Sequence, residues 1–340
     1  DVPPNRQLWG IFTAVVSAGI AISVLMLTVS EVGGIILFLL LAIPIWFVGF
    51  SLPVLAWWGT SNKLLGLPTR RRDAEAWLMA GMASAFPAFI FNSLIAPEII
   101  PFDSDNWAYE FSLLAAGAPF CEEIFKAMAV AVFLPYISGP KQGFQVGFTV
   151  GLGFALIENF QYIGISLLDG ALSVSITILV RGIGSIPGHA VWTAITGTAI
   201  GWMATDKELK ARLSWKARSM AITAIDMAEG MGIDTDGDGD LSGFDGDRFT
   251  LEEMISQASL DNPDESPWII LGKKTEEKTE TGPKLGIDDF YLTYDKTPVS
   301  KTTKGIQTPK GILAAISLSI GGHSFWNGSS FLSFYAPKWL

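Results

Sequence analysis

The chain has 340 residues, of which 49% are hydrophobic and only 16% are charged. Water-soluble domains of this length seldom have a positive mean hydropathy, so we expect an integral membrane protein. The net charge of −10 is concentrated between Asp226 and Asp295, where 19 acidic residues face five basic ones. This distribution argues against nucleic acid as a partner.

Seven apolar windows follow one another along the chain, and each is close to the roughly 20 residues that a helix needs to cross a bilayer. We place them at Leu8–Val29, Gly33–Trp57, Ala74–Ala96, Ala108–Ile137, Gln142–Leu168, Ala171–Thr205 and Gly311–Tyr335. The expected fold class is therefore all-α, a polytopic bundle of about seven transmembrane helices. We divide it into residues 1–107 (three helices), 108–205 (three helices that carry the site), 206–309 (an acidic insertion) and 310–340 (the last helix).

The basic residues predict the orientation of this bundle, because short loops rich in Lys and Arg stay in the cytoplasm. Alternate loops hold all of these residues, namely Arg6, Lys63, Arg70, Arg71, Arg72, Lys141, Lys207, Lys210, Arg212, Lys216 and Arg218. The loops between them hold acidic residues and no Lys or Arg. We therefore expect the N-terminus and the acidic insertion to be cytoplasmic.

Two glycine pairs predict close contacts between helices. Gly147 and Gly151, and then Gly197 and Gly201, are each one helical turn apart. Small residues at this spacing let helix backbones approach each other within a membrane. We expect these positions to lie at helix–helix interfaces.

A small set of ionisable and amide side chains falls inside the apolar windows. The set comprises Glu122, Glu123, Lys126, Glu158, Asn159, Arg181, His189, His323 and Asn327, and it includes both histidines of the chain. A charge at the bilayer centre costs roughly 2.5–3.5 kcal/mol even on lenient scales, so such groups are usually retained for function. For any single residue, an ion pair that locks helix register is an equally good interpretation. For the ensemble we favour function, because the titratable groups outnumber the two permanent cations.

Helical spacing indicates which of these groups act together. Lys126 is three residues from Glu123 and four from Glu122, so it can pair with either carboxylate. His323 and Asn327 share a helix face in the same way. We expect the polar stripes of four helices to face one another around a small hydrated cavity.

These residues resemble motifs of the PrsW family of intramembrane proteases. Glu122-Glu123-Ile-Phe-Lys126 is similar to the first motif of this family, and Gly151-Leu-Gly-Phe-Ala-Leu-Ile-Glu158-Asn159 to its second. The helix with Arg181 and Pro187-Gly-His189 is similar to the third, and His323-Ser-Phe-Trp-Asn327 to the last. The resemblance covers the fourth to seventh predicted helices, with the motifs in the family's order.

The resemblance implies peptide-bond hydrolysis within the membrane, in a fold related to the CAAX prenyl endopeptidases. It implies that Glu122 or Glu123 activates a water molecule as general base, with Glu158 at the position of a prenyl-endopeptidase histidine. His189 and His323, with Asn159 or Asn327, would polarise the scissile carbonyl. Lys126 and Glu158 depart from the prenyl-endopeptidase pattern, which argues against prenylated substrates.

Zinc is the competing mechanism, because Glu and His residues are also ligands of this metal. No HExxH sequence is present, and no two histidines share a predicted helix. We therefore favour glutamate chemistry without a metal. The other hypotheses for the whole protein are a proton-coupled transporter and a non-catalytic membrane scaffold.

The acidic insertion contains a sequence that fits a calcium-binding EF-hand loop of twelve residues. Acidic residues fall at positions 1, 3 and 5, a glycine (Gly239) at 6, and an Asp instead of the usual Glu at 12. The expected ligands are Asp234, Asp236, Asp238, Asp240, Ser242 and Asp245. Helical patterns flank the loop at Lys216–Met231 and Phe249–Ala258.

The expected partners are the lipid bilayer and a single-span or otherwise membrane-associated protein substrate. We expect the membrane to be the plasma membrane of a prokaryote. The stretch after Asn262 has few aromatic residues and is predicted to connect flexibly to the last helix.

Overall fold

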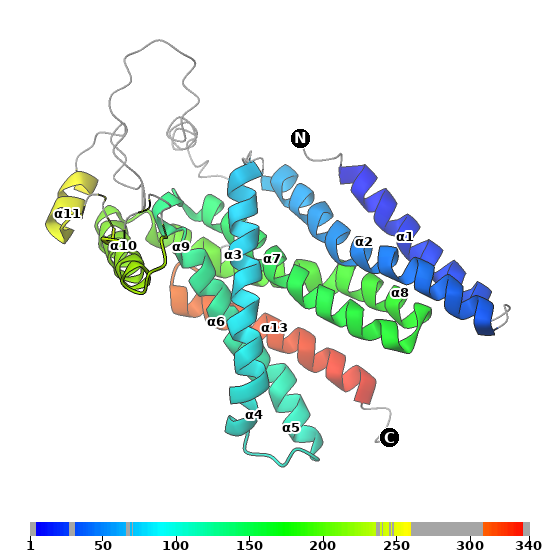
Figure 1. Ribbon diagram of the computed structural model, residues 1–340. Coiled ribbons are helices and arrows are strands. Elements are labelled where there is room, and N and C mark those ends of the chain that lie inside the picture. The colour runs from blue at the N-terminus through cyan, green and yellow to red at the C-terminus, as the bar shows by residue number, and fades with distance from the viewer. Residues whose placement is uncertain are drawn as a thin grey trace, which may run out of the picture. The chain divides into compact units, whose positions relative to one another are not determined.

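The computed structural model describes residues 5–26, 31–65, 69, 71–235, 239, 241–244, 246, 248–259 and 309–335. Four of the predicted calcium ligands, Asp236, Asp238, Asp240 and Asp245, and the predicted connector after Asn262 lie outside these residues. The described residues form helices and the loops between them, without strands, which confirms the all-α class (Figure 1). They divide into two compact units, one drawn from 1–131, 141–199 and 308–340, the other from 132–140 and 200–307.

The helices of the first unit follow the predicted apolar windows closely. Their bounds are α1 (Asn5–Met26), α2 (Glu31–Leu65), α3 (Arg71–Ile90), α4 (Ala96–Ile99), α5 (Trp107–Ser112), α6 (Ala118–Ala131), α7 (Pro140–Ser166), α8 (Ala171–Val180), α9 (Ile186–Met203) and α13 (Ile312–Tyr335). A short 3-10 turn, η4 (Leu167–Asp169), follows α7.

Three π-helical turns join some of these elements into longer helices. These turns are η1 (Phe91–Ile95) between α3 and α4, η2 (Leu113–Gly117) between α5 and α6, and η5 (Arg181–Ser185) between α8 and α9. In each of them a backbone N–H bonds to the carbonyl five residues earlier, as from Ala96 to Phe91. π turns inside α-helices frequently occur at functional sites, and apolar periodicity gives no sign of them.

Four helical stretches of the described residues are long and apolar enough to cross a membrane. They are Arg6–Leu25, Arg71–Ile99, Pro140–Asp169 and Ala171–Met203, which match four of the seven predicted windows. Helices α2, α5 with α6, and α13 occupy the other three windows. That these three also cross the bilayer stays a prediction.

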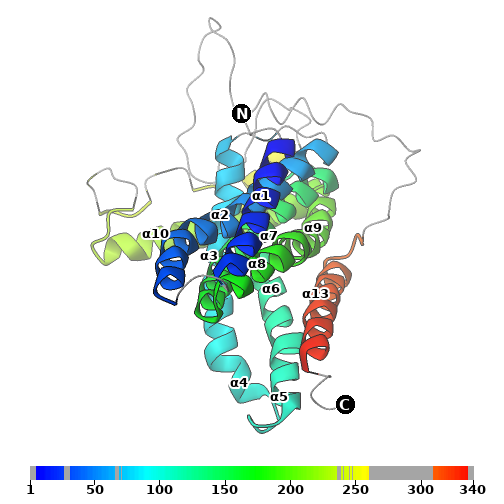
Figure 2. The ribbon, with the colours of Figure 1, turned by 90° about the vertical axis from the view of Figure 1, so that its right-hand side faces the viewer.

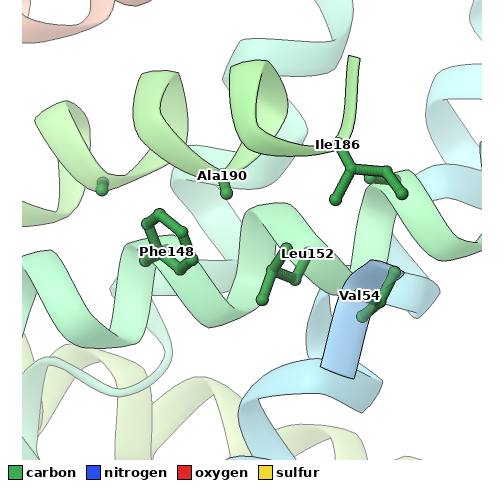
Figure 3. Packing of buried hydrophobic residues seen from close by; sticks show 7 residues of the cluster. Val54, Phe148, Leu152, Ile186 and Ala190 are labelled. Carbon is green, nitrogen blue, oxygen red and sulfur yellow. The ribbon is translucent and has the colours of Figure 1, made fainter. Parts of the chain in front are cut away.

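The core of the first unit is formed by contacts between helices that are distant in sequence. Helix α1 packs on α2 and α8, while α3 packs on α6 (Figures 1 and 2). In the cluster of Figure 3, Phe148 and Leu152 of α7 face Ile186 and Ala190 of α9, and Val54 of α2 closes one end. This packing fixes α7 against α9, the two helices that carry Glu158 and His189.

Glycines allow the close approach of α7 and α9. A Cβ atom built on Gly151 would lie 2.4 Å from the carbonyl oxygen of His189, and one on Gly147 would lie 2.5 Å from that of Thr193. A Cβ on Gly197 would lie 2.2 Å from the carbonyl oxygen of Gly143. Both glycine pairs therefore lie at close backbone contacts, as predicted.

The second unit contains η3 (Leu134–Tyr136), α10 (Lys207–Gly230) and α11 (Leu251–Ser259). The side chain of Asp206 caps α10 by accepting from the N–H of Leu209, and Thr250 and Glu253 form a reciprocal capping box at α11. These helices confirm the two helical stretches predicted around the acidic loop.

The described part of the acidic loop is bonded to the end of α10. Glu229 accepts from the N–H of Gly243 at 2.7 Å and from the hydroxyl of Thr235 at 2.9 Å. Asp226 accepts from the N–H of Phe244 at 2.9 Å. Gly239 has a φ of +81°, a left-handed backbone conformation that glycine adopts readily.

Candidate active site

Helix α6 supplies three ionisable side chains, and all of them are buried. The exposed fractions of Glu122, Glu123 and Lys126 are 6%, 1% and 0%. As the helical spacing predicts, the lysine lies beside both carboxylates. Its Nζ atom is 2.8 Å from Oε1 of Glu123 and 3.5 Å from Oε2 of Glu122. The ring of Phe154 lies 4.0 Å from the same ammonium group, which further shields it.

Helix α13 contributes His323, which links the two carboxylates. Its Nδ1 atom is 3.0 Å from Oε1 of Glu123, and its Nε2 atom is 3.8 Å from Oε2 of Glu122. A carboxylate only accepts, so Nδ1–H donates to Glu123 and a neutral ring keeps its lone pair on Nε2. The indole of Trp192 stacks on the imidazole at 4.6 Å and holds its plane.

Helix α9 contributes His189, which connects Lys126 to Glu158. The Nζ atom of Lys126 is 2.8 Å from Nδ1 of His189, and Nε2 of His189 is 2.6 Å from Oε2 of Glu158. An ammonium group only donates, so Nδ1 accepts and Nε2–H of a neutral ring donates to Glu158. Both ring nitrogens of His189 are thus engaged in hydrogen bonds.

Arg181, the first residue of η5, ends this chain of contacts. Its Nη2 atom lies 2.7 Å from Oε2 of Glu158, and its Nε–H donates to Oδ1 of Asn159. The ring of Tyr162 lies 4.2 Å from the guanidinium carbon. Arg181 therefore binds two consecutive residues of α7 and pairs with Glu158.

The structure separates the two asparagines proposed to bind the oxyanion. Asn159 is buried beside Arg181, and its amide nitrogen has no hydrogen-bond partner. Asn327 does lie one helical turn after His323, but its amide donates to the backbone carbonyl of Leu114 at 3.0 Å. Leu114 lies in the π turn η2, so the Asn327 amide is bonded to this turn. Sharing a helix face with His323 did not bring Asn327 into the ionisable network.

Side chains from four helices thus meet in one buried network, as the sequence predicts. Its members are Glu122, Glu123, Lys126, Glu158, Arg181, His189 and His323, from α6, α7, η5, α9 and α13. Their catalytic role stays a prediction.

Three further residues touch the network and were missed by the sequence analysis. Asn92 in η1 donates to Oε1 of Glu122 at 3.3 Å, Trp192 stacks on His323, and Tyr162 lies over Arg181. The signal for Asn92 was an amide inside an apolar window, the same signal that identified Asn159. Trp192 and Tyr162 gave no signal, because aromatic residues are common in membrane helices.

A metal ion is the chemical alternative for this site. The ligand atoms of Glu122, His189 and His323 lie within 4.8 Å of one another, and a Glu with two His is a donor set of zinc hydrolases. However, His189 already donates to Glu158 and accepts from Lys126. Of these three residues, only Glu122 and His323 keep a lone pair free, on Oε2 and Nε2 respectively. In this arrangement the set does not fit a metal ion, which needs a free lone pair from every ligand.

A helical membrane bundle with a buried network of carboxylates, histidines and a lysine indicates a functional site within the membrane. Comparison with known families finds a match over part of the chain. Residues 74–226 match the model of the PrsW family intramembrane metalloprotease. The match includes every network residue except His323. No curated protein and no solved structure matches the chain.

The family match confirms the resemblance and supports a membrane protease as the activity. The family description contains the word metalloprotease, whereas the sequence analysis favours glutamate chemistry without a metal. The match does not decide between these two kinds of chemistry.

Proposed function

We propose that this chain is an intramembrane endopeptidase in which Glu122 activates the hydrolytic water. The observation that carries the proposal is the pair formed by Oε2 of Glu122 and Nε2 of His323. These two atoms lie 3.8 Å apart, too far for a direct hydrogen bond. Oε2 of Glu122 is buried without a hydrogen-bond partner, and a neutral His323 that donates from Nδ1 to Glu123 leaves the lone pair of Nε2 free. A water molecule that donates to both would be oriented for attack.

Glu122 is a better candidate for the base than Glu123. Oε1 of Glu123 already accepts from Lys126 at 2.8 Å and lies 3.0 Å from Nδ1 of His323. A carboxylate held in this way orients its neighbours, as in the carboxylate–histidine pairs around many catalytic centres. Glu123 would therefore fix the tautomer of His323, and Glu122 would accept the proton.

The reaction then needs few steps. Glu122 takes a proton from water as the oxygen attacks the scissile carbonyl carbon, and a tetrahedral oxyanion forms. The unpartnered amide of Asn159 is a suitable donor to this oxyanion, whereas the amide of Asn327 is already bonded to Leu114. The same Glu122 delivers its proton to the leaving nitrogen as the C–N bond breaks. The products are a new carboxylic acid and a free amine.

The test is cleavage of a single-span protein substrate by the purified protein in detergent. We expect Glu122→Gln to abolish cleavage while helical circular dichroism stays unchanged, and a chelator such as 1,10-phenanthroline to leave cleavage intact. Glu122→Ala and Glu123→Ala should also fold but not cut. A protein that still cleaves without both carboxylates would refute the proposal. Inactivation by the chelator, reversed by added zinc, would replace it with metal chemistry.

The substrate class is part of this proposal. Glu158, Arg181 and His189 lie on helices that are apolar enough to span a bilayer, so the substrate would be a single-span or membrane-associated protein. The alternative of a proton-coupled transporter would instead give substrate-dependent proton flux in liposomes, and a scaffold would give neither activity.

We also propose that the loop 234–245 binds Ca²⁺ through the six residues predicted from the sequence. The two capped helices on either side and the positive φ of Gly239 support this proposal. Isothermal titration of the full-length protein with CaCl₂ should give saturable heat that Asp234→Asn reduces. Absence of heat in the wild type would refute the proposal.

The orientation is proposed from the basic loops alone. With an inside N-terminus, the acidic insertion would face the cytoplasm of a prokaryotic cell. Externally added trypsin should then cut the insertion in inside-out vesicles and spare it in right-side-out vesicles. The opposite pattern would reverse the orientation.

A further inference from the structure

Asn92 lies in the π turn η1, which interrupts the long helix from Arg71 to Ile99. The backbone N–H of Ala96 bonds to the carbonyl of Phe91 across this turn. A π turn inserts one extra residue and so rotates the side chains around it relative to an ordinary α-helix. The turn is surrounded by apolar residues, so an amide at this point is unusual for a helix that faces lipid.

The Asn92 side chain contacts the carboxylate that we propose as the base. Its Nδ2–H donates to Oε1 of Glu122 at 3.3 Å. This hydrogen bond joins η1 to α6, the helix on which α3 and η1 pack. Among the described residues, this is the one hydrogen bond that the Glu122 carboxylate receives. Lys126 lies near the other oxygen, at 3.5 Å. The amide oxygen of Asn92 is buried and has no partner of its own.

We propose that Asn92 is a positioning residue for Glu122 in peptide-bond hydrolysis, an inference that rests on the proposed function. By binding Oε1, the amide fixes the rotation of the carboxylate. Oε2 then faces Nε2 of His323, where the water would be oriented. Without the amide, the carboxylate would turn towards Lys126 and the water would lose its acceptor. The amide acts through Glu122 and does not itself touch the reacting atoms.

A purely structural role must give a different result in the test. An Asn between two membrane helices also stabilises their packing through its hydrogen bond. If packing were the whole role, near-isosteric Asp or Leu would preserve catalysis in the protein that folds, and Ala would be the most harmful change. If the donor is what matters, Asp and Leu must both lose activity, because Leu has no donor and an ionised Asp carboxylate only accepts.

The experiment compares kcat and KM of Asn92→Asp, Asn92→Leu and Asn92→Ala with those of the wild type, on the same membrane substrate. Loss of a hydrogen bond to a charged group corresponds to roughly a 10- to 150-fold change in a rate constant. We expect each variant to lower kcat by about this factor while KM stays within about twofold. Ser93→Ala is the matched control, because Ser93 lies in the same π turn and is exposed. It should keep the wild-type kcat.

The outcomes separate this inference from the proposed function. If Glu122→Gln cleaves as fast as the wild type, the proposed function fails, and the role of Asn92 fails with it. If Glu122→Gln is inactive while Asn92→Asp and Asn92→Leu keep the wild-type kcat, only the inference about Asn92 is overturned. A thermal unfolding transition in detergent shows whether each variant is folded. If Asn92→Asp does not fold, Asn92→Leu still provides the test, because Leu is well tolerated in a membrane helix.

Discussion

The replacement of Lys126 by Met tests how strongly the buried network depends on its central cation. Met preserves most of the side-chain volume and removes the charge. Lys126 has no exposed surface, and its Nζ lies 2.8 Å from Glu123 and 2.8 Å from His189. At this distance the attraction to one carboxylate is about 6 kcal/mol for an effective dielectric constant near 20. Desolvation offsets part of this energy.

The expected cost follows from what the substitution leaves behind. Breaking a buried pair by removing one partner typically costs about 3–5 kcal/mol, because the other charge stays buried without compensation. We expect a loss of this size for Lys126→Met in equilibrium unfolding by SDS, together with loss of cleavage. The double variant Glu123→Gln/Lys126→Met should recover at least half of the lost stability, because no uncompensated charge then remains at that pair.

Arg71→Met is the matched control, because the ion pair of Arg71 with Glu75 is short at 2.6 Å but exposed. Solvent screens such a pair, so we expect no measurable change in stability. The reasoning would be wrong if Lys126→Met cost less than about 1 kcal/mol. It would also be wrong if the double variant were no more stable than the single one, since the penalty would then not arise from the orphaned carboxylate.

Three further predictions concern helix contact, the end of the network and the loop. Gly151→Ala should lower the stability by about 1–3 kcal/mol and cleavage at least about tenfold, because the added Cβ would meet the His189 carbonyl. Gly164→Ala on the same helix should be tolerated in the same unfolding and cleavage assays. Arg181→Lys should lower kcat, since a lysine cannot bind both Glu158 and Asn159 as the guanidinium does; equal kcat would contradict this. The hydrogen bond from Arg248 holds the pKa of Asp226 below its ordinary value of 3.8. This contact therefore stabilises the loop above pH 3.8, and the stabilisation is lost as the pH falls through the lowered pKa of the folded protein. Amide exchange at Phe244, corrected for intrinsic rates, should therefore accelerate in strong acid, and Asp226→Asn should remove that dependence.

The sequence predicts those features of the site that depend on short-range helix geometry. The spacing from Glu122 to Lys126 fixes their shared face, and the structure contains both contacts. The cost of intramembrane charge correctly indicated that Glu158 and His189 would meet across two helices. The glycine spacing correctly located the interface that brings them together.

Two of the features that were missed depend on irregular backbone. The π turn η1 contains Asn92, and no periodicity of the segment Phe91–Ile95 predicts the extra residue of that turn. The π turn η2 contains the carbonyl that accepts from Asn327, so this amide lies on the predicted helix face but does not join the ionisable network. Local patterns predict helices, but the positions of π turns are set by tertiary contacts.

The charge balance of the network gives a physical reason for the choice of base. Glu158 pairs with Arg181 at 2.7 Å, and Glu123 pairs with Lys126 at 2.8 Å. Glu122 is thus the carboxylate without a close cation of its own, with Lys126 at 3.5 Å as its nearest one. A carboxylate in a close ion pair gives up that attraction when it binds a proton, whereas Glu122 gives up less. Of the three carboxylates, it is the one that can take a proton from water and return it at least cost to the rest of the network.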